Sequence, residues 1–276
     1  QSSVSTATTT TVTVTPSLGK ILSGRVVLRD AKGVDLAPAK TLTPADNGTA
    51  SFTVPIAKLA EPVIAAVLPN LQGKVEYADE AIQTQVSTIT VPTADINKPI
   101  LRAAATLTPN ANLGVTALTE AAVQQAENAS GGLIAQNINQ ANAAVKNQLK
   151  VNFDITQAPI VVGLGEFDKL VNAALDAQRR AYAAYLATLA KEAQRLNISS
   201  TTPAYDMAKV LAGDLSDGTF DAKQGVTALS FYNANFINAW VNWVQNFYAS
   251  FAQLSNIVAL NRWYSGFDIA NKDSIK

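Results

Sequence analysis

The sequence contains no cysteine and no histidine among its 276 residues. The absence of cysteine excludes disulfides, thiol nucleophiles and thiolate metal sites. The absence of histidine excludes the Ser-His-Asp triad and most zinc sites. No catalytic, cofactor or metal motif in the remaining residues rises above background. We therefore expect a protein that is not an enzyme and that carries no cofactor and no metal.

Charge is scarce and balanced. Lys+Arg and Asp+Glu both number 21, and charged residues make up 15% of the chain, against about 25% in an average protein. This balance gives no reason to expect nucleic acid or an anionic membrane as a partner. Low charge at zero net charge instead favours self-association, so copies of the chain itself are the expected partners.

Long apolar runs are also missing. None reaches the ~18 residues that a membrane-spanning helix needs, so we expect no membrane span. The chain begins with Gln1, rather than with the Met of an unprocessed chain or the Cys of a lipid-anchored bacterial lipoprotein. We read this as a processed N-terminus, as expected of a secreted, extracellular protein.

What the sequence has in abundance is a β-prone N-terminus. Thirteen of the first fifteen residues are Ser, Thr or Val, and Pro16 closes the run. Because β-branched side chains suit a pleated surface, residues 1–16 predict one long extended strand. A disordered polar tail is the alternative. Backbone pairing with the same chain or with a neighbouring molecule would hold the strand, and one of its faces carries Val4, Thr6, Thr8, Thr10, Val12 and Val14.

Residues 17–107 predict a β-sandwich domain. Turn signals recur at roughly ten-residue spacing between short strand patterns, which is typical of an immunoglobulin-like sandwich. The apolar run at residues 62–68 is consistent with a buried strand. The expected strands are residues 20–30, 49–54, 62–68, 74–77, 86–91 and 100–105.

Residues 108–276 predict an all-α domain, a helical bundle, because the apolar pattern there has the period of a helix. Thr116 is the expected N-cap of its first helix, with Glu120 in the first turn. The expected helices run from Thr116 to about Asn128 and over residues 133–149, 165–196, 203–215 and 224–260. The complete prediction is a two-domain α+β chain with a leading strand.

The last predicted helix has the strongest periodicity in the chain. Its aromatic residues are spaced 4, 4, 3, 4 and 4, which places them on one helical face: Tyr232, Phe236, Trp240, Trp243, Phe247 and Phe251. The favoured interpretation is the core seam of a bundle. The alternative is an aromatic surface for a carbohydrate or a peptide, formed by Trp240, Trp243, Trp263 and Tyr264.

Two acidic clusters are the remaining candidates for chemistry. Residues 214–221, DLSDGTFD, place their carboxylates in the wrong register for a calcium loop, so a helix end and a turn explain them. The second cluster falls in a predicted hydrophilic turn and is interpreted as solvated charge: Glu76, Asp79 and Glu80. Neither cluster predicts a metal site or an acid/base pair.

Two parts of the sequence resemble known protein families. Residues 24–68, with GRVVLRDAKG and DNGTASFTV, resemble the carboxypeptidase-regulatory-like, transthyretin-like β-sandwich of bacterial surface proteins. Three later stretches resemble a helical domain that follows such sandwiches in secreted proteobacterial proteins: VTALTEA at 115–121, YLATLA at 185–190 and LAGDLSDGTFD at 211–221. Ala117 stands where that group usually has Pro. The resemblance implies a location and an architecture, and it implies no activity.

The leading hypothesis is a non-enzymatic structural subunit of an extracellular or cell-surface filament. Addition of the N-terminal strand to the sandwich of the next copy would be heterologous and open, so it would propagate as a fibre. The alternative is a monomeric secreted module that binds carbohydrate or peptide through the C-terminal aromatic residues. A glycosidase-like enzyme that uses carboxylates alone is the third hypothesis, and the sequence names no carboxylate pair for it.

Overall fold

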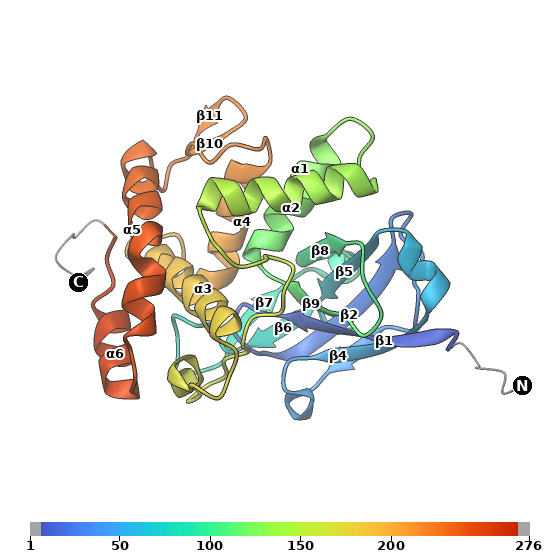
Figure 1. The fold of residues 1–276 in the computed structure, drawn as a ribbon, viewed down its shortest axis with the longest axis horizontal. Helices are drawn as coiled ribbons and strands as arrows, with labels where there is room; N and C mark the ends of the chain where they lie inside the picture. The colour runs from blue at the N-terminus through green and yellow to red at the C-terminus, as the bar shows by residue number, and fades with distance from the viewer. Residues whose placement is uncertain (1–6, 270–276) are drawn as a thin grey trace, which may run out of the picture.

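The computed structural model describes residues 7–269 and shows an α+β protein whose strands come first and whose helices follow (Figure 1). The strands are β1 (Thr9–Pro16), β2 (Ile21–Asp30), β3 (Lys40–Leu42), β4 (Ala50–Pro55), β5 (Val63–Leu68), β6 (Lys74–Tyr77), β7 (Ser87–Thr90), β8 (Leu101–Ala105), β9 (Asn112–Val115), β10 (Lys223–Gln224) and β11 (Thr227–Ala228). The α-helices are α1 (Ala117–Asn128), α2 (Ala135–Leu149), α3 (Ala177–Arg195), α4 (Pro203–Leu215), α5 (Ala234–Ala252) and α6 (Ile257–Ser265).

Two sheets make up the N-terminal part. The larger has the order β7-β6-β2-β5-β8, with β3 also paired to β2, and the smaller has the order β4-β1-β9. Strand β5 lies between β2 and β8, and all six of its residues are buried. This burial explains why its sequence is continuously apolar rather than alternating. The strand predictions for β2 and β4 to β8 are confirmed to within two residues at each end.

Helix α1 begins where the sequence predicts. The Thr116 hydroxyl accepts hydrogen bonds from the backbone N–H groups of Leu118 (3.1 Å) and Thr119 (3.4 Å), so Thr116 is the N-cap. The predicted helices at 133–149 and 203–215 are also present, as α2 and α4.

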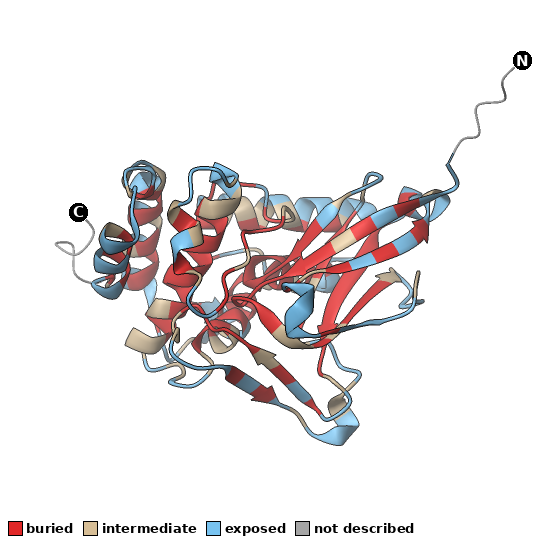
Figure 2. Cartoon of the chain, turned by 90° about the horizontal axis from the view of Figure 1, so that it is seen from below, coloured by how far each residue is buried: buried red, intermediate tan, exposed pale blue. Residues whose placement is uncertain are grey.

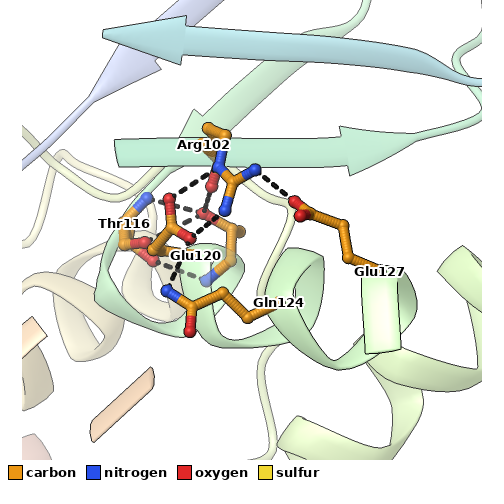
Figure 3. A network of polar contacts seen from close by, with 6 residues as sticks. Arg102, Thr116, Glu120, Gln124 and Glu127 are labelled. Carbon is orange, nitrogen blue, oxygen red and sulfur yellow. Dashed lines mark hydrogen bonds and ion pairs between the residues drawn. The ribbon is translucent and has the colours of Figure 1, made fainter. Parts of the chain in front are cut away.

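An ion-pair network ties α1 to the larger sheet (Figure 3). Arg102 of β8 donates from Nε to Oε1 of Glu120 at 3.0 Å and from Nη2 to Oε2 at 2.8 Å. Arg102 also pairs with Glu127, which lies about two helical turns beyond Glu120 in α1. Two parallel bonds between a guanidinium and a carboxylate fix orientation as well as distance, so this network sets how α1 lies on β8.

Two predicted long helices are shorter than expected. Instead of one helix over 165–196, a 3-10 turn (Phe167–Val171) precedes α3, because Asp176 caps α3 by accepting from the backbone N–H of Arg179 at 2.9 Å. Instead of one helix over 224–260, the β10–β11 hairpin precedes α5 and α6. Side-chain caps from Asn233 and Asn256 start these two helices and so interrupt the predicted run.

One core joins the two parts of the chain. A single cluster of buried apolar side chains extends from Val12 in β1 to Ile269 beyond α6. Figure 2 shows buried residues continuing from the strands into the helices. The predicted boundary at 107/108 falls just before β9, and β9 still belongs to a sheet because it pairs with β1.

Candidate functional site

The N-terminal strand is the feature with the clearest potential for function, and the structure places it in the middle of the smaller sheet. Residues Thr9–Val14 of β1 pair antiparallel with β4, and residues Thr13–Pro16 pair parallel with β9. In the smaller sheet, β1 lies between β4 and β9 and pairs with both. We call the space between β4 and β9 the β1 slot. It lies on the side of the molecule away from α5 and α6 (Figure 1).

The two faces of β1 differ as the period-2 pattern predicts. Thr10, Val12 and Val14 are buried, whereas Thr9 and Thr11 are exposed. Both valines are 0% exposed, and full burial of a valine side chain stabilises by about 1.5–3 kcal/mol. Of the other predicted assembly residues, Thr8 is exposed, and Val4 and Thr6 lie outside the described residues.

Threonine side chains fix the register of β1 against the chain around β9. The Thr15 hydroxyl donates to Oδ1 of Asn112 at 2.7 Å. The backbone N–H of Asn110 donates to the Thr10 hydroxyl at 3.0 Å, and Asn110 has the left-handed φ of 61°. A register slip would break these bonds and would turn the buried valines to the outside.

Sequence reasoning did not predict β9. Its four residues, NLGV, include Asn and Gly, which strands usually avoid. Gly114 is required there because a Cβ would lie 2.5 Å from the carbonyl oxygen of Gln157. The signal that could have found β9 is its place directly before the Thr116 cap, and that signal is weak.

The chain leaves β1 through a tight hinge, residues 17–20, before it enters β2 in the other sheet. The backbone N–H of Ser17 bonds to the Val115 carbonyl at 2.9 Å, and the N–H of Ala78 bonds to the Lys20 carbonyl at 2.9 Å. Gly19 has φ +74°, and a Cβ on it would lie 1.7 Å from the Ala78 carbonyl oxygen. The hinge is therefore packed directly on the chain that follows β6.

These observations correct the prediction for the first sixteen residues. Of the ten described residues of this run, 7–16, the last eight form the strand, and they pair within their own chain; residues 1–6 lie outside the described residues. Val12 and Val14 face the core of their own molecule rather than a groove on another subunit. The apolar alternation makes β1 a regular core strand in the single chain.

The proposed aromatic surface is wrong, because its members lie in the core. Exposed fractions are 0% for Trp240, 3% for Trp243, 8% for Trp263 and 7% for Tyr264. Trp240 Nε1 donates to the Tyr185 hydroxyl of α3 at 2.9 Å. The aromatic face of α5 packs on α3 and α6, as the core-seam interpretation predicts, so these rings are not available to a ligand in the folded chain.

The acidic residues of the second cluster are also placed differently from the prediction. Asp79 is 1% exposed and Glu80 is 3% exposed, whereas Glu76 is half-buried. Asp79 accepts from the Tyr77 hydroxyl and from the backbone N–H of Ala204 in α4, each at 2.9 Å. The reason is tertiary: helices far along the chain cover this turn, and no local pattern reveals it.

In the first acidic cluster, residues 214–221, Asp214 forms hydrogen bonds to the backbone. Asp214 is 0% exposed and accepts from the backbone N–H of Asp221 at 3.0 Å and from the Tyr232 hydroxyl at 2.6 Å. Burial raises the pKa of the Asp214 carboxyl, and these hydrogen bonds lower it in part. Over residues 7–269 no group of acidic side chains is arranged to hold a metal ion.

One surface hollow contains two carboxyl groups. It has a volume of about 590 Å³, and Asp30 and Glu61 are among its lining residues. The Asp30 carboxylate accepts from the backbone N–H groups of Lys32 and Val34, both at 2.9 Å, and these bonds lower its pKa. Asp30 therefore holds the turn after β2 through these two backbone hydrogen bonds.

No protein-family model, curated protein or solved structure matches this chain. In the part of the chain that the structure describes, no helix combines the length and the apolar character needed to cross a membrane. The β1 slot and its hinge remain the candidate site.

Proposed function

We propose that the protein is a secreted, non-enzymatic structural subunit of an extracellular or cell-surface filament, assembled by exchange of β1 between copies. In the assembled form, β1 of one copy occupies the β1 slot of the next. The proposal includes a transthyretin-like sandwich for the two sheets, followed by a helical bundle. The observation that carries it is that β1, the first strand of the described residues 7–269, lies between β4 and β9 and pairs with both.

The contacts made in an exchanged slot are the same as those made within one chain. Val12 and Val14 would be buried again, and Thr15 would again bond to an Asn112. The exchange therefore costs little contact energy, and protein concentration decides the balance between the two forms. Balanced charge, with 21 residues of each sign, adds no repulsion between copies.

Exchange in one direction can build an open polymer. Each copy gives β1 to one neighbour and receives β1 from another, so donor and acceptor surfaces differ. Such a heterologous contact closes into a ring or continues into a filament. A hinge of residues 17–20 connects β1 to β2, and it is short enough that the next copy must lie close to the first.

A disulfide lock tests the proposal in a chain that has no native cysteine. Thr11 and Thr53 are exposed and directly opposite on β1 and β4, where Cα atoms are about 4.5–5.5 Å apart and suit a disulfide. We expect oxidised Thr11→Cys/Thr53→Cys to stay monomeric at concentrations where the reduced form assembles. Light scattering and electron microscopy measure assembly.

The matched control is Glu76→Cys/Thr88→Cys, which staples the β6–β7 pair and leaves β1 free. It should assemble whether oxidised or reduced. Mixing the two single variants Thr11→Cys and Thr53→Cys should give disulfide-linked dimers on a non-reducing gel. Assembly of the locked variant at the rate of the reduced one would contradict the proposal, and so would the absence of assembly in every sample.

A further inference from the structure

The hinge after β1 covers a buried glutamate. Glu80 is 3% exposed, and its Oε1 has no hydrogen-bond partner among residues 7–269. The hydroxyl of Ser17, in the hinge, is 1% exposed and likewise has no partner within the described residues. Buried polar atoms without partners are rare in folded proteins, and two of them at one place call for a physical explanation.

Both residues border the same small cavity. Its volume is about 10 Å³, which is room for about one water molecule. Apart from Ser17 and Glu80 its lining is apolar and comes from the hinge and from α1, α3 and α4: Leu18, Ala117, Leu186, Leu189, Ala190, Ala204 and Met207. An ionised carboxylate here would lack the solvation that its charge requires.

The ionisable groups around Glu80 do not offset this cost. Burial raises the pKa of Glu80 well above its ordinary value, the Asp79 carboxyl raises it further, and the backbone N–H of Gly19 lowers it. Tyr264 of α6 bonds to the Glu80 backbone carbonyl at 3.1 Å and is itself uncharged. The residues of α1, α3 and α4 that line the cavity are uncharged, so the groups that face Glu80 favour its neutral form.

We propose that Glu80 is a pH-sensitive latch on β1: its neutral carboxyl lets the hinge pack closed, and its ionisation opens the hinge and frees β1. Opening is a property of the single chain. Its consequence, faster strand exchange and assembly at higher pH, rests on the proposed function.

The sign follows from proton linkage. A carboxyl whose pKa is raised in the closed state binds its proton more tightly there than in the open state. The closed hinge is thus most favoured near and below pH 4.5, which is the ordinary pKa of a glutamate such as Glu80. As pH rises toward the raised pKa, the open fraction increases by up to about tenfold per pH unit. Asp79, whose pKa is about 6, contributes with the same sign up to about that pH.

Hydrogen exchange of the β1 amides in dilute, monomeric protein tests the latch. After correction for intrinsic exchange rates, we expect the protection factors of β1 to fall by up to about tenfold per pH unit as the pH rises above about 6, where Asp79 no longer contributes. In Glu80→Gln, whose side chain cannot ionise, β1 protection should be independent of pH over this range. Glu61→Gln, which removes an exposed carboxylate, is the matched control and should behave as the wild type.

Ser17→Ala provides a second variant that preserves Glu80. Loss of the hydroxyl makes the cavity more apolar and raises the pKa of Glu80 in the closed hinge further, so the fall in β1 protection should continue to a higher pH than in the wild type. The same pH dependence in Glu80→Gln as in the wild type would overturn the latch. An equal fall for α5 amides would also overturn it, because that result means global unfolding rather than hinge opening.

The readout separates the two proposals. If β1 opens with pH as described and no filament forms at any pH, the latch stands and the proposed assembly fails. If assembly occurs but neither it nor β1 protection depends on Glu80, the assembly stands and the latch fails. Light scattering of concentrated wild type and Glu80→Gln at the same pH values completes the comparison.

Discussion

Replacing Trp240 by alanine is expected to lower the free energy of unfolding by about 3–5 kcal/mol. The side chain is 0% exposed, and its ring contacts those of Tyr185, Phe236 and Trp243 at centroid distances of 5.4, 5.9 and 4.9 Å. The substitution removes these contacts and leaves a cavity. It also leaves the Tyr185 hydroxyl without its indole partner. Urea denaturation measures the change as a shift of the midpoint at constant slope.

Phe231→Ala is the matched aromatic control for this variant. Phe231 is 42% exposed and precedes the same helix, so its loss should cost less than about 1 kcal/mol. A cost for Trp240→Ala as small as that for Phe231→Ala would contradict the core-seam assignment. It would restore the aromatic residues of α5 as a surface available to a carbohydrate.

The second large effect is expected from Gly19→Ala, which should lower the free energy of unfolding by at least about 3 kcal/mol. Two terms add. An alanine at φ +74° costs about 1–2 kcal/mol relative to glycine. The added Cβ would also lie 1.7 Å from the carbonyl oxygen of Ala78, and because that atom is backbone, the hinge or the turn after β6 has to move.

Gly33→Ala isolates the first of these terms. Gly33 has φ +87°, and a Cβ on it would have no atom of residues 7–269 within 4 Å, so only the backbone cost of about 1–2 kcal/mol should remain. Thermal and urea unfolding of the two variants, measured side by side, give the contribution of the clash as a difference. Equal costs for the two variants would show that the hinge does not pack against Ala78 as described.

Local patterns in the sequence predicted the elements that local chemistry controls. The Thr116 cap, the alternation of β4 and the apolar run of β5 all appear where expected. Each depends on residues a few positions apart, and the period of the pattern matches the period of the element. The alternation of β1 is correct for the same reason.

The errors have two causes, helix caps that the pattern did not reveal and contacts with distant segments. Asp176 and Asn233 start helices inside what looked like continuous helical pattern, because their side chains bond to the backbone ahead of them. Asp79 and Glu80 read as solvated charge, yet they are buried. Nothing within ten residues of that turn reports that α3 and α4 will cover it.

The candidate site was predicted in part. The sequence pointed to the first strand and to its apolar face, and Val12 and Val14 are buried as that face requires. It did not identify the two neighbours of the strand, because β9 is four residues long and lies far along the chain. The hinge glycine and the glutamate beneath it were also not identified, since neither has a motif.

The parallel pairing of β1 with β9 has a consequence for how the chain folds. Thr15 and Asn112, which bond across this pair, are 97 residues apart in the sequence. Closing so long a loop lowers the conformational entropy of the chain before the pairing contributes any stabilisation. This sheet is therefore expected to form late and slowly. Strand β1 is synthesised well before β9, so it lacks this neighbour until β9 has also been made. During that interval the local concentration of nascent chains, rather than the stability of the finished fold, determines whether β1 pairs with β9 of its own chain or with β9 of another.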